Sequence, residues 1–101
     1  MSEKIWFVYM IRTNDGQLYT GITTDMQRRW REHLTGKGGA RYFRTRKPKS
    51  LCFLEQHTDR SSASKREAAI KQLAKSAKEL LVHTQPVPAE FDCGDILLEK
   101  A

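Results

Sequence analysis

The chain has 101 residues, about the length of one ordinary domain. Hydrophobic residues make up 39% of it and charged residues 30%, which excludes a disordered chain and predicts a soluble globular protein. The longest apolar run, residues 5–11, is far shorter than the ~20 residues of a membrane-spanning helix, and the N-terminus does not resemble a signal peptide. Two cysteines, Cys52 and Cys93, are too few for a disulfide scaffold, so we expect reduced thiols in a cytoplasmic protein.

The net charge of +6 is distributed unevenly along the chain. Residues 86–101 carry −3, and residues 1–85 therefore carry +9. This division predicts one domain over residues 1–85, followed by an acidic C-terminal tail over residues 86–101 that is flexible or loosely docked. A body this basic favours a polyanionic partner, with nucleic acid as the leading candidate. A solvated surface kept soluble by its net charge is the alternative.

A hairpin is predicted at the start of the domain. Residues 5–11 are apolar on both alternating faces, which indicates a central strand buried on both sides. Residues 14–16 have the composition of a tight turn, and residues 17–22 are typical of a second strand.

The register of this hairpin decides where two tyrosines lie. A three-residue loop, with Gly16 in the left-handed conformation, pairs Tyr9 with Gly21 and leaves space beside the phenol. This is the preferred register, and in it Tyr9 and Tyr19 lie on one face of the hairpin. A two-residue loop would put the two tyrosines on opposite faces.

A helix and a third strand are predicted next. Asp25 is the expected N-cap of a helix that runs to about Thr35, and Gly36 is expected to end it. Residues 36–49 are glycine-rich and basic, which is typical of a loop, and residues 51–56 have strand character.

Helices are predicted for the rest of the domain. Ser61 or Ser62 is the expected cap of a long helix. Ser76 is expected to cap a further helix that ends at about Thr84, with Glu79 as its partner in a capping box. The element order is therefore β-β-α-β-α-α, an α+β fold with a small antiparallel sheet.

The apolar stripe of the first helix contains two ionisable residues. Met26, Trp30 and Leu34 form the stripe, and Arg29 and His33 fall within it. An arginine buried without an anion is costly, so Arg29 is expected to meet a carboxylate or a bound phosphate. A structural salt bridge or a snorkelling arginine explains the position equally well, and hydrogen-bonded packing is the commoner role for a histidine like His33. Outside the stripe, and mostly facing solvent, are Arg28 and Arg31.

A carboxylate lies in a similar position on the later helix. Glu67 falls within an apolar stripe formed by Ala63, Ile70, Ala74 and Ala77. Glu67 could pair with Arg29, or it could hold a divalent cation as an oxygen ligand. In the second case bound phosphate oxygens and waters would complete the ligand shell, as is normal for Mg²⁺ at phosphates.

Residues 28–49 hold nine Lys or Arg residues and one acid. Glycines make part of this stretch pliable, and Tyr42 and Phe43 could stack on nucleobases while the cations follow phosphates. A solvated run of charges is the alternative. The cations expected to contact nucleic acid are Lys37, Arg41, Arg44 and Arg46.

An ordered set of short motifs runs through the chain: Phe7-Val8-Tyr9, Tyr19-Thr20-Gly21, residues 25–33, and Glu67 with Ile70-Lys71-Gln72-Leu73. Taken together, these motifs resemble the GIY-YIG nuclease domain. Residues 18–25 are similar to the small stand-alone bacterial members of the YhbQ type, and the resemblance covers roughly residues 4–84.

The resemblance implies a three-stranded antiparallel sheet flanked by helices and a phosphodiesterase that uses one divalent cation, Mg²⁺ or Mn²⁺. It implies Tyr9 and Tyr19 as the two motif tyrosines, one of which helps to deprotonate the attacking water. Arg29 matches the arginine that steadies the scissile phosphate, and Glu67 matches the metal-binding glutamate.

Two further residues match the family, and two positions depart from it. Gly21 matches the motif glycine, and His33 matches a recurrent position on the same helix. Phe7 stands where the first motif has glycine. Asn14, in the turn, is the only asparagine, whereas many members have a functional asparagine late in the domain.

We therefore predict a metal-dependent endonuclease that acts on DNA or structured nucleic acid, with a role in DNA repair and no membrane partner. A nucleic-acid-binding module that keeps the fold without cleaving is one alternative. A domain whose basic face binds an acidic protein is another. Retention of Tyr9, Tyr19, Arg29 and Glu67 together argues against mere binding, which would not require Glu67.

Overall fold

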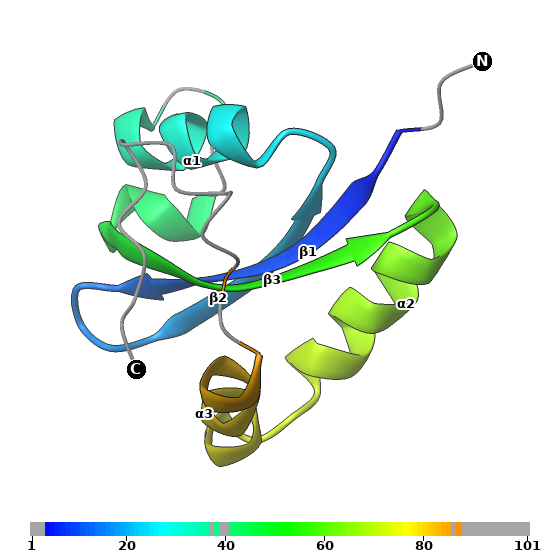
Figure 1. Cartoon of the computed structure of the whole chain (residues 1–101). Coiled ribbons are helices and arrows are strands. Elements are labelled where there is room, and N and C mark those ends of the chain that lie inside the picture. Colours follow the sequence, from blue (N-terminus) through cyan, green and yellow to red (C-terminus); the bar gives the residue numbers. More distant parts are fainter. Residues whose placement is uncertain (1–3, 37, 39–40, 86, 88–101) are drawn as a thin grey trace.

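The computed structural model describes residues 4–36, 38, 41–85 and 87, and it has the predicted α+β element order (Figure 1). A three-stranded antiparallel sheet is combined with three α-helices, and a short 3₁₀ turn, Arg41–Arg44, precedes the third strand. The strands are β1 (Trp6–Thr13), β2 (Leu18–Thr23) and β3 (Pro48–His57), and the helices are α1 (Met26–Thr35), α2 (Arg60–Lys71) and α3 (Lys75–Thr84).

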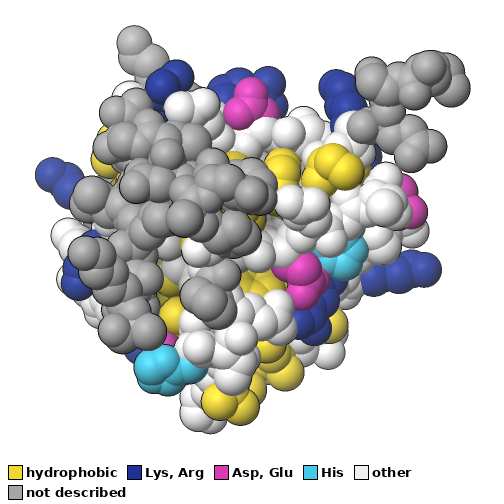
Figure 2. Space-filling view, in the orientation of Figure 1, with side chains coloured by type: hydrophobic (Ala, Val, Ile, Leu, Met, Phe, Trp, Pro, Cys, Tyr) yellow, Lys and Arg dark blue, Asp and Glu magenta, His cyan; other side chains and the backbone are white. Residues whose placement is uncertain are grey.

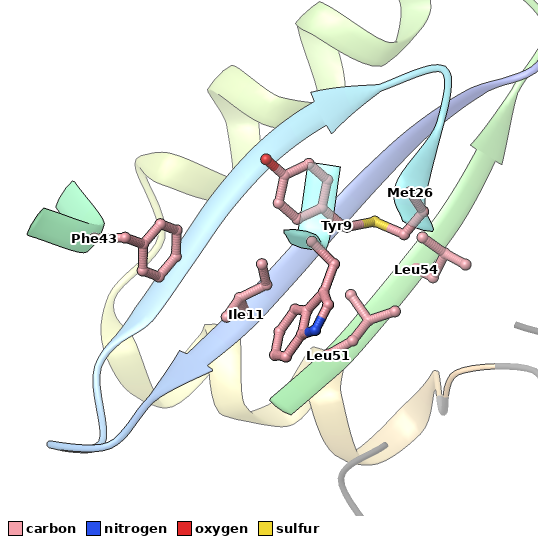
Figure 3. Close-up of a cluster of buried hydrophobic side chains, with 7 residues drawn as sticks. Tyr9, Ile11, Met26, Phe43, Leu51 and Leu54 are labelled. Carbon is pink, nitrogen blue, oxygen red and sulfur yellow. The ribbon is translucent and has the colours of Figure 1, made fainter. Parts of the chain in front are cut away.

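The strand order is β2-β1-β3, so β1 is the central strand and β2 and β3 are the edges. Alternate residues of β1 enter two different cores, which confirms the prediction that this strand is buried on both sides. α1 and the 3₁₀ turn cover one face of the sheet, and α2 and α3 cover the other (Figure 1). The core under α1 contains Tyr9, Ile11, Met26, Trp30, Phe43, Leu51 and Leu54 (Figure 3).

The hairpin adopts the three-residue loop. Thr13 N donates to Gln17 O at 2.9 Å, and Gly16 has a left-handed φ of 85°. Tyr9 is paired with Gly21, which confirms the predicted register and places Tyr9 and Tyr19 on one face.

α1 begins and ends where expected. Asp25 accepts a hydrogen bond from Arg28 N at 3.0 Å, and Gly36 ends the helix with a φ of 79°. The predicted stripe is wrong at Leu34, whose exposed fraction is 53%, whereas His33 is buried. At ~100° per residue, position i+7 lies only about 20° from Met26, but position i+8 lies about 80° away. The buried stripe therefore passes through His33.

Both predicted caps of the later helices are wrong. Asp59, not Ser61 or Ser62, caps α2 by accepting from Ser62 N at 2.7 Å. Aspartate satisfies exposed helix N–H groups as well as serine does, and it comes first along the chain.

α3 starts without a side-chain cap. Its N-cap is Ala74, and Ser76 lies inside the helix. Glu79, expected as the capping-box partner, instead accepts hydrogen bonds from both Nη atoms of Arg12, at 2.8 and 2.6 Å. This pairing holds α3 against β1 and holds the pKa of Glu79 below its ordinary value. The predicted stripe around Glu67 is wrong beyond α2, because Ala74 is the N-cap of α3 and Ala77 lies within α3.

The third strand is longer than predicted, because it starts at Pro48 within the expected loop. Cys52 lies in this strand, and its buried thiol donates to Met10 O at 3.5 Å. Cys93 and residues 88–101 lie outside the described residues, so the acidic tail and the domain boundary remain predictions. Val87 is described, and it packs against the core under α1.

None of the helices in the described part of the chain is long and apolar enough to cross a membrane. α3 has no buried residue and is the most exposed helix, with Leu80 at 62%. Figure 2 shows hydrophobic atoms on the surface near the lower end of the molecule, where α3 lies in Figure 1.

Candidate active site

Tyr9 reaches across the sheet toward its edge strand. A Cβ added to Gly21 on β2 would lie 2.5 Å from the Tyr9 hydroxyl oxygen and 2.7 Å from its Cζ atom. The phenol ring therefore lies directly over Gly21, where any side chain would collide with it. Figure 3 shows the Tyr9 hydroxyl directed away from Leu51 and Leu54 of β3. The cross-strand glycine thus determines where this hydroxyl is placed.

Three ionisable groups surround the Tyr9 hydroxyl. Its oxygen lies 2.8 Å from His33 Nε2, and the Arg29 guanidinium lies near enough to favour the charged form of the phenol. Burial raises the pKa of Tyr9 far above its ordinary value, and the nearby Glu67 carboxylate adds to this rise, while Arg29 opposes it. Tyr9 is therefore a neutral phenol at pH 7.

His33 is buried beside Tyr9 and is uncharged at neutral pH. Burial and the Arg29 guanidinium lower the pKa of His33 to about 4. A neutral imidazole has one donor and one acceptor nitrogen, so the Tyr9 hydroxyl donates to Nε2 in one tautomer and accepts from it in the other.

The lowered pKa of His33 predicts an acid-sensitive fold. Its pKa falls from 6.5 in the unfolded chain to about 4 in the folded protein, so the unfolded chain binds more protons between these values. The free energy of unfolding should therefore decrease as the pH falls below 6.5, by about 3 kcal/mol in total at ~1.4 kcal/mol per pH unit. Urea denaturation at pH 7 and pH 4.5 should show this loss in the wild type and a smaller loss in His33→Gln.

His83, which is exposed on α3, provides the matched control for this measurement. His83→Gln should keep the acid sensitivity of the wild type. An acid sensitivity that is identical in His33→Gln and the wild type would contradict the buried, neutral state of His33.

Two adjacent arginines lie on different sides of α1, as predicted. Arg28 is 62% exposed, whereas Arg29 is 27% exposed and lies against Tyr9. The carboxylate that binds Arg29 is Glu32, at 2.9 Å, and not Glu67. Burial opposes the charged form of Arg29, but hydrogen bonds to Glu32 and Tyr9 outweigh it and raise the pKa of Arg29.

Glu67 approaches the site from the opposite layer. It lies on α2, whose Ala63 and Ile70 pack under the sheet, and yet its charge acts on Tyr9. Its side chain is 23% exposed, and its ion pair with the exposed Lys71, at 3.4 Å, is loose. Glu67 therefore lies near enough to Tyr9 for its charge to raise the pKa of the phenol, although the two residues lie in different layers of the fold.

Tyr19 lies at the centre of an aromatic cluster. Its ring centroid lies 6.2 Å from that of Tyr9, 5.5 Å from that of His33 and 5.2 Å from that of Tyr42. Phe43 completes the cluster, with its ring centroid 4.9 Å from that of Tyr19. These contacts fix Tyr19 beside the Tyr9–His33 pair.

The family model of the GIY-YIG catalytic domain matches residues 5–80. The chain belongs to the GIY-YIG family. Among its relatives, the UPF0213 protein DP2720 of Desulfotalea psychrophila is 54% identical over 76% of this chain and 70% of its own length. The UPF0213 protein plu4503 of Photorhabdus laumondii is 47% identical over 86% of this chain and 83% of its own length.

A solved structure of another such protein supports the same fold. The solution NMR structure of the UPF0213 protein BH0048 from Bacillus halodurans matches with a TM-score of 0.51 and 38% identity. The match covers 78% of this chain and 83% of the other.

The GIY-YIG family implies a divalent cation, and the residues present fit one. Within residues 4–36, 38, 41–85 and 87, no three His, Cys, Asp or Glu side chains gather as a ligand group. Mg²⁺ is nevertheless commonly bound through one or two carboxylates, with waters and substrate phosphates as the other ligands. Glu67 offers one such carboxylate, partly exposed and only loosely paired.

The two aromatic residues of the basic stretch, Tyr42 and Phe43, differ in how far they are buried. Phe43 is buried in the core, so the expectation that it stacks on nucleobases is wrong. Tyr42 is only half-buried, and the Arg46 guanidinium lies 5.0 Å from its ring centroid. Burial raises the pKa of Tyr42, and Arg46 partly opposes the rise.

The cations of this stretch are not equivalent. Arg41 and Arg44 are exposed on the 3₁₀ turn, whereas Arg46 is bound to Asp15 of the hairpin loop at 3.0 Å. Lys37 lies outside the described residues. Figure 2 shows Lys and Arg side chains projecting from several sides of the molecule rather than from one compact patch.

Sequence reasoning missed the partners of the basic residues. Glu32 lies three residues after Arg29 on α1, and this spacing is itself a signal for pairing within a helix. No comparable signal links Asp15 to Arg46, because the two are 31 residues apart.

Proposed function

We propose that this member of the GIY-YIG family is a metal-dependent endonuclease that hydrolyses phosphodiester bonds in DNA or structured nucleic acid in the cytoplasm. The observation that carries the proposal is the environment of one hydroxyl group. The Tyr9 hydroxyl is hydrogen-bonded to His33, and the charges of Arg29 and Glu67 act on it from opposite layers of the fold. A tyrosine that only packs in the core does not require an arginine, a histidine and a glutamate around its hydroxyl group.

In the proposed reaction, Tyr9 and His33 handle the proton of the attacking water. A phenol with an ordinary pKa of about 10 is a poor base at pH 7. His33 Nε2, 2.8 Å from the Tyr9 oxygen, is the proposed acceptor of the phenolic proton as the phenol accepts the proton of the water. Burial and the Arg29 charge lower the pKa of His33, and a bound phosphate that offsets the Arg29 charge would make His33 a better proton acceptor. Tyr19 lies against both groups and holds them in place.

Arg29 and Glu67 act on the phosphate. Arg29 donates hydrogen bonds to the phosphate oxygens, where negative charge accumulates in the transition state. Glu67 is the proposed ligand of a divalent cation, Mg²⁺ or Mn²⁺, which when bound supplies positive charge to the scissile phosphate and the attacking water.

We propose that the basic stretch binds the nucleic acid outside this centre. Arg41 and Arg44 are the exposed cations available for phosphate contacts, and Lys37 is proposed to join them. Tyr42 and Arg46 are proposed to contact the substrate as a unit, since the guanidinium already lies over the ring. DNA is the favoured substrate, and repair of DNA is the proposed setting.

Incubation with nucleic acids tests the function directly. Supercoiled plasmid, single-stranded DNA and RNA are each incubated with the protein and Mg²⁺ or Mn²⁺, and with EDTA as the control. Cleavage that requires the cation supports the proposal. Binding without cleavage would indicate a non-cleaving module, and binding that nucleic-acid competitors do not affect would indicate a protein-interaction domain.

Substitution of two adjacent arginines tests the site. Lysine at position 29 keeps the charge but loses the planar fork that binds two phosphate oxygens. Arg29→Lys should therefore slow cleavage about tenfold or more, ~1.4 kcal/mol of transition-state stabilisation. Arg28→Lys should change little, since Arg28 is 62% exposed. Equal losses in single-turnover rates at saturating enzyme would contradict the placement of Arg29.

A further inference from the structure

Glu32 lies near two arginines of α1 and accepts a hydrogen bond from one of them. Its Oε1 atom accepts from Arg29 Nη1 at 2.9 Å, whereas its Oε2 atom lies 3.9 Å from Arg28 Nε, beyond hydrogen-bonding distance. Spacing does not dictate this choice, because positions i−3 and i−4 are both within reach on a helix. The selected pair is the less exposed one, in which water screens the interaction less.

A backbone carbonyl binds the same nitrogen of Arg29. Gly38 O accepts from Arg29 Nη1 at 2.9 Å. Gly36 and Gly38 both have left-handed φ angles, 79° and 78°, which glycine adopts without strain. A Cβ added to Gly38 would lie 3.8 Å from the Glu32 carboxylate carbon, so Gly38 lies beside that carboxylate. Glu32 and Gly38 thus form one pair of acceptors around Nη1.

The hydrogen-bond donors of Arg29 divide into two groups. A guanidinium has five N–H groups in a fixed plane. The two on Nη1 match the two acceptors, Glu32 and Gly38. Three N–H groups, on Nε and Nη2, remain for Tyr9 and an incoming anion. A planar, bidentate contact with a phosphate requires two of them.

We infer that Glu32 is the positioning residue for Arg29 in phosphodiester cleavage, an inference that rests on the proposed nuclease function. Glu32 does not contact the substrate. With Gly38 O it holds Nη1 and so fixes the guanidinium plane, which leaves the remaining N–H groups directed at Tyr9 and the phosphate. The side chain of Arg29 is thereby ordered before the substrate arrives, so less conformational entropy is lost in the transition state.

If Glu32 acted only through its negative charge, its removal would have the opposite effect on substrate binding and cleavage. A carboxylate near a phosphate-binding arginine repels the substrate, so its neutralisation would tighten binding and leave cleavage equal or faster. Positioning predicts a graded loss instead. Glu32→Gln retains an oxygen that accepts from Arg29, and it should cleave within about twofold of the wild type, whereas Glu32→Ala retains none and should lose about fivefold or more.

A double-mutant cycle on single-turnover rates is the kinetic test, with plasmid and Mg²⁺ at saturating enzyme. If Glu32 acts through Arg29, Glu32→Ala should cause no further loss in an Arg29→Ala background. The matched control is Arg28→Ala, which should leave the rate unchanged. A loss from Glu32→Ala that is the same in both backgrounds would overturn the inference.

The order of the Arg29 side chain is a second readout, and it does not require cleavage. The Nε–H signal of Arg29, followed by ¹⁵N relaxation in the free protein, should report greater mobility in Glu32→Ala and nearly wild-type order in Glu32→Gln. Equal order in all three proteins would overturn the positioning role. If no form of the protein cleaves nucleic acid, the nuclease proposal fails by itself, while the relaxation data still show whether Glu32 orders Arg29.

Discussion

Glu67→Gln is expected to abolish metal-dependent cleavage, a loss of about a thousandfold or more, or ~4 kcal/mol of transition-state stabilisation. Glutamine has nearly the shape of glutamate, and the side chain at position 67 is 23% exposed, so the fold should persist. The amide has no negative charge with which to hold a divalent cation. Single-turnover rates measured over a range of Mg²⁺ concentrations test the prediction, together with nucleic-acid binding in EDTA, which should not change.

Lys71 offers a control for this experiment on the same helix. It is exposed and pairs with Glu67 at 3.4 Å, so Lys71→Ala alters the charge beside Glu67 without removing the carboxylate. This variant should cleave at close to the wild-type rate. Undiminished cleavage by purified Glu67→Gln would remove Glu67 from the mechanism.

Gly21→Ala is expected to slow cleavage about a hundredfold, ~3 kcal/mol of transition-state stabilisation. The new methyl group would lie 2.5 Å from the Tyr9 hydroxyl oxygen, so the ring must move. Movement breaks the hydrogen bond to His33, and overpacking in a buried site costs about 1–3 kcal/mol of stability. Single-turnover rates and urea denaturation measure the two losses.

Gly16→Asn separates this effect from a general intolerance of glycine substitution. Gly16 has a φ of 85°, with no atom within 4 Å of an added Cβ, and asparagine tolerates the left-handed region better than most residues. This control should retain nearly full cleavage. If Gly21→Ala cleaves as well as Gly16→Asn, the position of the Tyr9 hydroxyl does not matter for the reaction.

Several features of the site were predictable because they depend on short-range rules. The composition of residues 14–16 indicated the turn, and the preferred three-residue loop placed Tyr9 opposite Gly21. The helical period correctly separated Arg29 from Arg28, since adjacent helix positions differ by ~100°. The ordered motifs led to the GIY-YIG family.

Predictions failed where a local signal allowed more than one outcome. Leu34 and His33 both lie near the apolar stripe of α1, and packing against the aromatic cluster selects His33. Phe43 lies in a basic stretch of the sequence, but the 3₁₀ turn places its ring in the core beside Tyr19. Asp59 and Ser61 are both good caps, and the first of the two along the chain caps α2.

The sequence by itself determined the order of the elements, the place of the hairpin turn, the side of α1 that faces inward and the family. All of these follow from backbone geometry within one turn or one hairpin, or from motifs in order along the chain. Only the tertiary structure decided that Glu67 acts on Tyr9 from the opposite layer of the fold and that Glu32 is the carboxylate that binds Arg29. These contacts depend on how helices from the two faces pack around the sheet, and packing between distant segments leaves no periodic signal in the sequence.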